Sequence, residues 1–302
     1  MTAHQAERSQ WPLETRLFLA GGALTLLASP VAAAWLAPTA WLAVLAAAVA
    51  LAGLPHGALD PWLAQRAGIW RGLPGFVVFN LVYVAAAGAA AALWLAWPGP
   101  MLALFLAYAA WHFAADWRDT LGAGYRLVAG IGLIALPAVG HEARVAEIFA
   151  VLAGDDGAAI AHALAWAGPA IVLGHALATL VALARAPRVA AELALIAALA
   201  IALPPLAFFG VYFCLLHSSR HLREHLPAAS AARQRALVIA TIYTVATVAL
   251  AGLVWYTLGR GIAVDAVLLR LIFIGLAALT VPHMLLALYV ERQQTQPAHD
   301  AG

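Results

Sequence analysis

The sequence predicts an all-α, polytopic membrane bundle of about eight to ten transmembrane helices, some of them broken. Of the 302 residues, 65% are hydrophobic and 10% are charged, whereas a soluble domain carries about 25% charged residues. The mean hydropathy is +0.90. The polar surface is too small to cover a globule in water, so lipid must solvate most of the protein.

Ten apolar segments, separated by Arg, Pro and Gly, have lengths near the roughly 17 to 25 residues that a bilayer requires. The two short ones, at 125–140 and 189–203, are expected to be tilted, broken or re-entrant. The ten segments cover residues 17–36, 40–65, 73–97, 100–117, 125–140, 158–184, 189–203, 205–226, 236–258 and 266–290.

Arginine placement predicts the orientation of these spans, because cationic loops favour the cytoplasm. With ten alternating spans, only Arg144, Arg260 and Arg270 lie opposite the N-terminus, and the other arginines lie on its side. The pattern predicts a protein of the inner cell membrane with both termini in the cytoplasm.

The two ends of the chain are predicted to lie outside the bundle. The first apolar run is longer than the roughly 7 to 15 residues of a signal-peptide core, so residues 1–16 are interpreted as a cytoplasmic leader before an uncleaved span. Residues 293–302 are predicted to form a flexible tail. No repeat or long linker divides the chain, which predicts one membrane-embedded domain over residues 1–302.

Histidines inside the apolar segments carry the main functional signal. They are His56, His112, His217, His221 and His283. Two of them stand near an aspartate, which costs roughly 2.5 to 3.5 kcal/mol at mid-helix against about 0.3 to 0.6 gained per large apolar residue. The predicted topology places all five histidines in the cytoplasmic half of the bilayer. We therefore expect these residues to be functional.

The spacing of the histidines predicts a metal site. His217 and His221 are four residues apart, so they share one helical face and can chelate one ion. A site of neutral imidazoles with one or two open positions suits ferrous iron that handles dioxygen better than it suits a closed structural site.

Two aspartates repeat this spacing. Asp60 follows His56, and Asp116 follows His112, each by four residues. A carboxylate in such a place accepts the second ring N–H of a ligand histidine or binds the metal itself. We predict the first role for both aspartates.

The other histidines and the single cysteine have simpler interpretations. His175 is expected to pack within an Ala-rich helix, and Cys214 to be a small buried hydrophobe. His283 follows a proline and is placed beside the site, where it either satisfies a freed backbone carbonyl or lines the pocket. The remaining histidines are interpreted as peripheral: His4, His141, His162, His225 and His299.

Four motifs, taken in order, resemble a known family. They are GLPHGALD at 53–60, WHFAADW at 111–117, HSSRH at 217–221 and VPHMLL at 281–286. In this order and at these separations they resemble the Brp/Blh family of membrane β-carotene 15,15′-dioxygenases. The resemblance implies that a catalytic Fe²⁺ is held by His56, His112, His217 and His221.

The same resemblance implies oxygen-dependent cleavage of the central double bond of β-carotene to two molecules of retinal. It implies a carotenoid and dioxygen as substrates, contact with membrane lipid, and a functional link to a retinal-binding rhodopsin. An apolar polyene dissolves in the bilayer and can enter between helices. The net charge of +2, without a basic run, indicates no nucleic-acid partner.

Residues beside the motifs are candidates for the wall of a substrate pocket. Ordinary helix packing is the alternative interpretation for each of the aromatic ones. The candidates are Tyr108, Trp111, Phe113, Phe208, Phe209, Tyr212, Phe213, His283 and Met284.

Three other classes of membrane protein use buried histidines. A di-iron hydroxylase or desaturase needs several HxxxH and HxxHH clusters, whereas this chain has one HxxxH pair, extended by His225. A divalent-metal transporter can use such motifs at mid-membrane, and a haem electron carrier can use facing histidines as axial ligands. Metal content, haem absorption and ion flux distinguish these classes.

Overall fold

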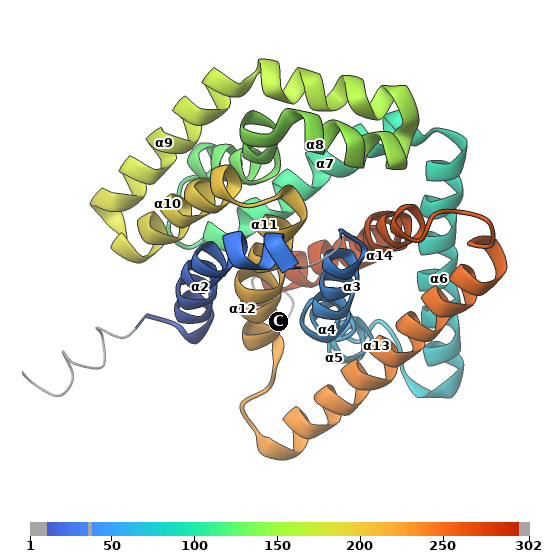
Figure 1. The fold of residues 1–302 in the computed structure, drawn as a ribbon. Coiled ribbons are helices and arrows are strands. Elements are labelled where there is room, and N and C mark those ends of the chain that lie inside the picture. Colours follow the sequence, from blue (N-terminus) through green and yellow to red (C-terminus); the bar gives the residue numbers. More distant parts are fainter. Residues whose placement is uncertain (1–10, 36–37, 296–302) are drawn as a thin grey trace, which may run out of the picture.

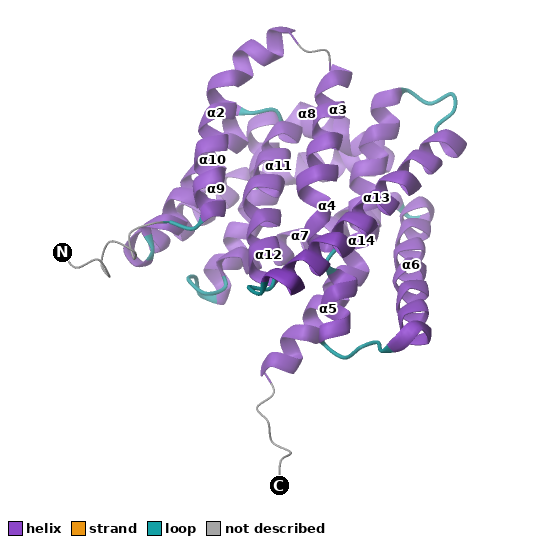
Figure 2. Cartoon of the chain, turned by 90° about the horizontal axis from the view of Figure 1, so that it is seen from below, coloured by secondary structure: helices purple, strands orange, loops and turns teal. Residues whose placement is uncertain are grey.

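The computed structural model describes residues 11–35 and 38–295, and every regular element in these ranges is a helix (Figures 1 and 2). The prediction of an all-α bundle is therefore confirmed. Most of the predicted leader and the end of the predicted tail, residues 1–10 and 296–302, lie outside the described residues.

Most helices follow the predicted apolar segments. The α-helices are α2 (Leu13–Trp35), α3 (Pro38–Ala48), α4 (Leu54–Gly57), α5 (Asp60–Arg66), α6 (Gly72–Ala96), α7 (Pro98–Ala114), α8 (Ala123–Trp166), α9 (Gly168–Arg185), α10 (Pro187–Ala202), α11 (Pro205–Val211), α12 (Ser218–His225), α13 (Ser230–Leu258) and α14 (Val264–Thr295). Two π-helical turns, η1 (Val49–Gly53) and η3 (Tyr212–His217), and one 3-10 turn, η2 (Ala115–Trp117), join some of them. Residues 158–166 of the predicted span 158–184, however, belong to α8 and not to α9.

Among the described residues, six helical runs are long and apolar enough to cross a membrane. The runs are Thr39–Arg66, Gly72–Ala96, Ala123–Trp166, Gly168–Arg185, Ser230–Leu258 and Val264–Gln293. The other predicted spans correspond to α2, α7, α10 and the rod formed by α11, η3 and α12. Of these, α7 and α10 have 17 and 16 residues, which suits helices that cross part of a bilayer or cross it without tilt.

Helix α8 shows how the chain departs from simple alternation. Its backbone is non-helical at His141, Ala153 and Gly154, so the first piece matches the short predicted span and a turn follows. Gly154 has a φ of 61°, a conformation that only glycine adopts without strain. A side chain at Gly157 would overlap the carbonyl oxygen of Phe149. The two glycines thus let the chain fold back on itself.

The broken rod α11–η3–α12 occupies the middle of the bundle. In Figure 1 it is surrounded by α2, α3, α7 and α14, and contacts join η3 to α2 and η1, and α12 to α4. The segments that carry the predicted motifs are therefore neighbours in space although they are far apart in sequence.

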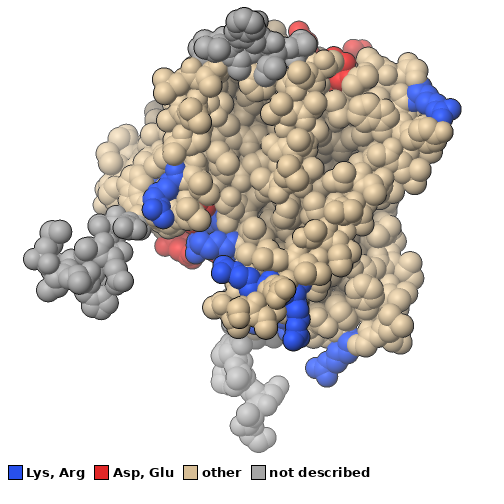
Figure 3. All heavy atoms as spheres, turned by 60° about the horizontal axis from the view of Figure 1, so that its bottom comes forward, with Lys and Arg blue, Asp and Glu red and all other residues tan. Residues whose placement is uncertain are grey.

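Charged side chains are distributed unevenly over the molecule. Figure 3 shows most of the visible arginines gathered toward one end of the bundle, with few at the other end. Arg66 is the last residue of α5, and Arg220 and Arg223 lie in α12. The asymmetry has the form that the positive-inside rule describes.

Candidate functional site

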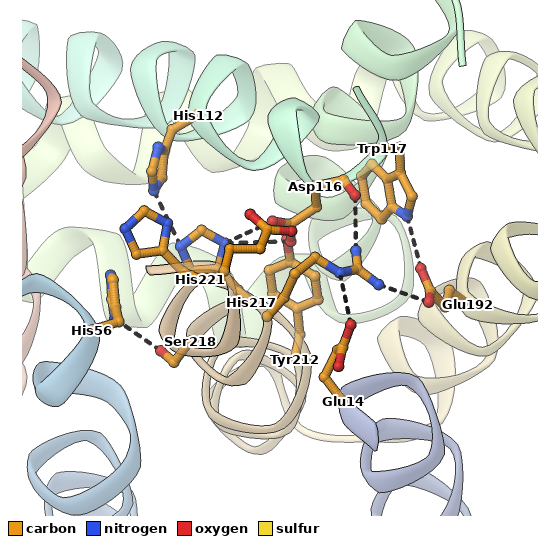
Figure 4. A network of polar contacts seen from close by, with 12 residues as sticks. Glu14, His56, His112, Asp116, Trp117, Glu192, Tyr212, His217, Ser218 and His221 are labelled. Atoms are coloured by element: carbon orange, nitrogen blue, oxygen red, sulfur yellow. Dashed lines mark hydrogen bonds and ion pairs between the residues drawn. The ribbon is translucent and has the colours of Figure 1, made fainter. Parts of the chain in front are cut away.

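Five histidines from α4, α7, η3, α12 and α14 meet inside the bundle. Figure 4 shows four of the rings turned toward a common centre. The ring centroids form a closed cycle, with separations of 5.2 Å for His56–His217, 4.8 Å for His217–His112, 5.7 Å for His112–His283 and 5.5 Å for His283–His56. His221 lies 5.3 Å from both His56 and His283. The four predicted ligands are thus brought together, and His283 lies beside them as a fifth histidine.

Local breaks in the helices bring the first and third motifs together. His56 follows the π-helical turn η1, and Pro55 stands in the first turn of α4, where the missing N–H has no cost. A side chain at Gly53 would overlap the ring of Phe213 in η3. Glycine at this position therefore lets the His56 segment approach η3 closely.

Hydrogen bonds orient the rings of His56 and His217. The Nδ1 of His56 donates to the carbonyl oxygen of Gly53 at 2.5 Å, with Ser218 Oγ 3.0 Å away. The Nδ1 of His217 donates to the Asp116 carboxylate at 3.1 Å. Since each ring carries its hydrogen on Nδ1, each Nε2 has a lone pair and no hydrogen, which is the form that can bind a cation.

Each aspartate accepts a hydrogen bond from a clustered histidine. That histidine lies on a different helix from the histidine that the motif spacing pairs with the aspartate. Asp116 binds His217, and Asp60 accepts from His283 Nδ1 at 2.9 Å. A turn between α4 and α5 separates Asp60 from the helix of His56, and the 3-10 turn η2 carries Asp116 out of α7. These breaks change the direction of each carboxylate, so the regular four-residue spacing does not hold.

Several ring nitrogens in the cluster face one another or have no partner. The Nε2 atoms of His112 and His217 are 3.1 Å apart, and the hydrogen between them belongs to His112 because His217 uses Nδ1 as its donor. The Nε2 atoms of His221 and His283 are buried and have no hydrogen-bond partner among the described residues. Buried polar atoms of this kind cost free energy unless a ligand satisfies them.

The chemistry of this donor set suits a cation. Imidazole nitrogens with free lone pairs bind transition metals well. Within the described part of the chain, no three donor atoms already have the spacing of an assembled metal site. The structure therefore shows imidazoles that converge, without the final coordination distances.

A buried ionic network lies beside the histidines. Arg220 donates to Glu192 at 2.7 Å and to the backbone oxygen of Asp116 at 2.9 Å. Glu192 has no exposed surface, and it also accepts from Trp117 Nε1 at 3.0 Å and Thr15 Oγ1 at 2.5 Å. Sequence reasoning missed this network. A glutamate inside the apolar segment 189–203 is the signal that could have found it.

A cavity of about 320 Å³ reaches the cluster. His112, His217, His221 and His283 line it, as do Asp60 and Asp116. Two further residues of the predicted pocket, Trp111 and Met284, also lie on its wall. The same wall continues to Arg118, Arg126, Glu224 and Glu291, so the cavity extends from the histidines toward charged groups.

The other predicted pocket residues do not line the cavity, and three of them contact the cluster or its aspartate. Phe113 and Phe213 have ring centroids 4.7 and 5.8 Å from His217, and Tyr212 donates to Asp116 at 2.6 Å. The remaining three sit farther out: Phe209 stacks on Phe213 at 5.1 Å, Phe208 is buried in the core, and Tyr108 packs on Trp111 at 6.0 Å.

Most of the remaining histidines lie where the sequence suggested. His175 is buried and bonds the carbonyl oxygen of Leu193 at 3.0 Å, and Cys214 is buried. The expectation that His225 is peripheral is wrong, because its ring centroid lies 4.1 Å from that of His221. A second turn of α12 extends the HxxxH face and brings it there. His4 and His299 lie outside the described residues.

The sequence is similar to proteins of one family. Residues 47–290 match the family model described as Beta-carotene 15,15′-dioxygenase. A relative named "Beta-carotene 15,15′-dioxygenase", from the uncultured marine bacterium 66A03, is 28% identical over 275 residues, covering 83% of this chain and 94% of the relative. A second, "Probable beta-carotene 15,15′-dioxygenase Blh" from Halobacterium salinarum, is 28% identical over 312 aligned positions, covering 86% of this chain and 87% of the relative.

No solved structure matches the chain significantly. The family model spans well over half of the sequence and includes all five clustered histidines. The chain therefore belongs to the β-carotene 15,15′-dioxygenase family of carotenoid-cleaving enzymes.

Proposed function

We propose that this protein cleaves the central 15,15′ double bond of β-carotene with dioxygen and releases two molecules of retinal. The observation that carries the proposal is the cluster of five buried imidazoles beside a cavity in an apolar bundle, in which the Nε2 atoms of His221 and His283 have no hydrogen-bond partner among the described residues. The names of the two relatives supply the substrate class.

In this proposal His56, His112, His217 and His221 hold Fe²⁺. Their donor chemistry fits, because the Nδ1 bonds of His56 and His217 leave a lone pair on each Nε2, and the Nε2 of His221 is buried without a partner among the described residues. His112 would present its Nε2 to the ion with the ring hydrogen on Nδ1, in place of the hydrogen bond that it now makes to His217. The iron, when bound, supplies a place where dioxygen is bound and activated beside the polyene.

The protein's own groups hold the ligands and keep water away. Asp116 fixes the His217 ring in the tautomer that presents Nε2, and the Gly53 carbonyl does the same for His56. Phe213 stacks on the ring of His217, and Phe113 packs against it in a T-shaped contact. These apolar rings shield His217 from water on the sides that they cover.

The cavity is proposed to receive the middle of the polyene. Its volume of about 320 Å³ lies at the low end of the roughly 300–1,000 Å³ that is usual for small-molecule pockets. A carotenoid is much longer than a drug-sized ligand, so its ends extend beyond this cavity. Trp111 and Met284 offer apolar contact next to the histidines.

We further propose that the arginine-rich end faces the cytoplasm of the inner membrane and that both termini lie there. The substrate then reaches the site from the lipid, in which it is dissolved. Retinal returns to the same lipid, where a retinal-binding rhodopsin can take it up.

The decisive experiment is expression in cells that accumulate β-carotene. Loss of colour and retinal in the extract are the expected results, and His217→Ala serves as the inactive control. Pigment that persists while iron-loaded protein is present would overturn the substrate assignment, and other carotenoids would then be tested. Two irons per chain would favour a di-iron hydroxylase, and metal flux into vesicles would favour a transporter.

A further inference from the structure

His283 repeats the hydrogen-bonding arrangement of His217. In one set, Tyr212 donates to Asp116 at 2.6 Å, and Asp116 accepts from His217 Nδ1 at 3.1 Å. In the other set, Tyr83 donates to Asp60 at 2.7 Å, and Asp60 accepts from His283 Nδ1 at 2.9 and 3.0 Å. The two sets use the same three residue types in the same order, on different helices.

The second set is deeply buried. Asp60 is 1% exposed and His283 is 5% exposed. A buried carboxylate is expensive unless donors satisfy it, and here the donors are Tyr83 and His283. The bond fixes the hydrogen of His283 on Nδ1, so its Nε2 carries only a lone pair. That nitrogen can accept a cation but cannot donate a hydrogen bond to a substrate.

The ring that carries this nitrogen also lies within the histidine cluster. Its ring centroid lies 5.5, 5.7 and 5.3 Å from those of His56, His112 and His221. Its Nε2 is buried without a partner among the described residues. A histidine that only satisfied the backbone freed by Pro282 would donate to a carbonyl of its own helix. His283 donates instead to Asp60 on α5.

We infer that His283 is a fifth imidazole ligand of the metal ion and that Asp60 and Tyr83 are positioning residues that act through it. The inference rests on the proposed function, which places a metal at this cluster. It gives the metal five nitrogen donors, so fewer positions remain open to dioxygen than a four-histidine site would leave.

The test uses the full-length protein in detergent with Co²⁺ as the probe, since the visible absorption of Co²⁺ reports the number and type of its ligands. We expect His283→Gln to change this spectrum and to weaken binding. Asp60→Asn is expected to weaken Co²⁺ binding by about 10- to 100-fold, as losses around metal ligands do, and Tyr83→Phe by less. None of these readouts depends on turnover.

His175→Gln is the matched control, because it removes another buried imidazole whose bond is to the Leu193 carbonyl. It should leave the spectrum unchanged. An unaltered spectrum and affinity in a folded His283→Gln protein would overturn the inference and leave the proposed function standing. If that variant does not fold, unaltered affinity in Asp60→Asn overturns it. Absence of Co²⁺ and Fe²⁺ binding by the unmodified protein would instead overturn the proposed function.

Discussion

His217 and Asp116 are joined by a hydrogen bond from Nδ1 to the carboxylate, at 3.1 Å, although 101 positions separate them in the chain. Both side chains are nearly fully buried. This one bond connects the second and third motifs and determines which nitrogen of His217 faces the cluster.

The first prediction concerns this carboxylate. Asp116→Asn keeps the size of the side chain but weakens its hold on His217, so iron affinity should fall by about 10- to 100-fold. Iron content after dialysis against a graded chelator measures the effect. Retention equal to that of the unmodified protein would show that Asp116 does not support a ligand.

The second prediction concerns the four proposed ligands. His56→Ala, His112→Ala, His217→Ala and His221→Ala should each abolish retinal formation and lower the iron content. His141 lies at a kink of α8, outside the cluster. The control variant His141→Ala should change neither retinal formation nor iron content. Full iron occupancy in any of the four would remove that histidine from the set.

The third prediction concerns the buried pair of Arg220 and Glu192. Removing Glu192 leaves the buried Arg220 with only the longer ion pair to Glu14 at 3.9 Å, so Glu192→Ala should destabilise the protein by about 3–5 kcal/mol. Arg220→Met combined with Glu192→Leu should cost less than the sum of the two single changes. Chemical unfolding in detergent, analysed as a double-mutant cycle, measures the difference, and strict additivity would contradict the pairing.

The fourth prediction concerns the close approach of η1 and η3. Gly53→Ala places a methyl group on the ring of Phe213, and overpacking of this kind costs typically about 1–3 kcal/mol. The shift should also lower activity, because His56 lies three residues later. Adding Phe213→Leu should restore part of both losses. No rescue by the second change would mean that the two segments do not touch as described.

Much of the architecture is readable from the sequence because it depends on local patterns. Apolar length fixes the helices, and the His217–His221 spacing fixes one face of α12. The partners of Asp60 could not be predicted in this way. They lie 23 and 223 positions away. Breaks at the ends of α4 and α7 also disrupt the four-residue helical spacing between histidine and aspartate that the motifs predict.

The role of Glu192 could not be predicted from motifs either. Its buried carboxylate is stabilised by hydrogen bonds from Arg220, Trp117 and Thr15, which lie on three other elements. The break of α8 at Ala153 and Gly154 also escaped prediction, because it depends on tight backbone contact at Gly157. Long-range packing, and not local preference, decides both features.

The π-helical turn η3 has a consequence for how the site tolerates change in length. A π-turn holds one residue more than the α-helical turn it replaces, and each residue of an α-helix advances the chain by roughly 100°. Deleting one apolar residue between Tyr212 and His217 would leave hydropathy almost untouched. It would nevertheless rotate His217 and His221 about the axis of α12 and away from the other rings. The number of residues in this single turn is thus as strict a requirement as the histidines themselves.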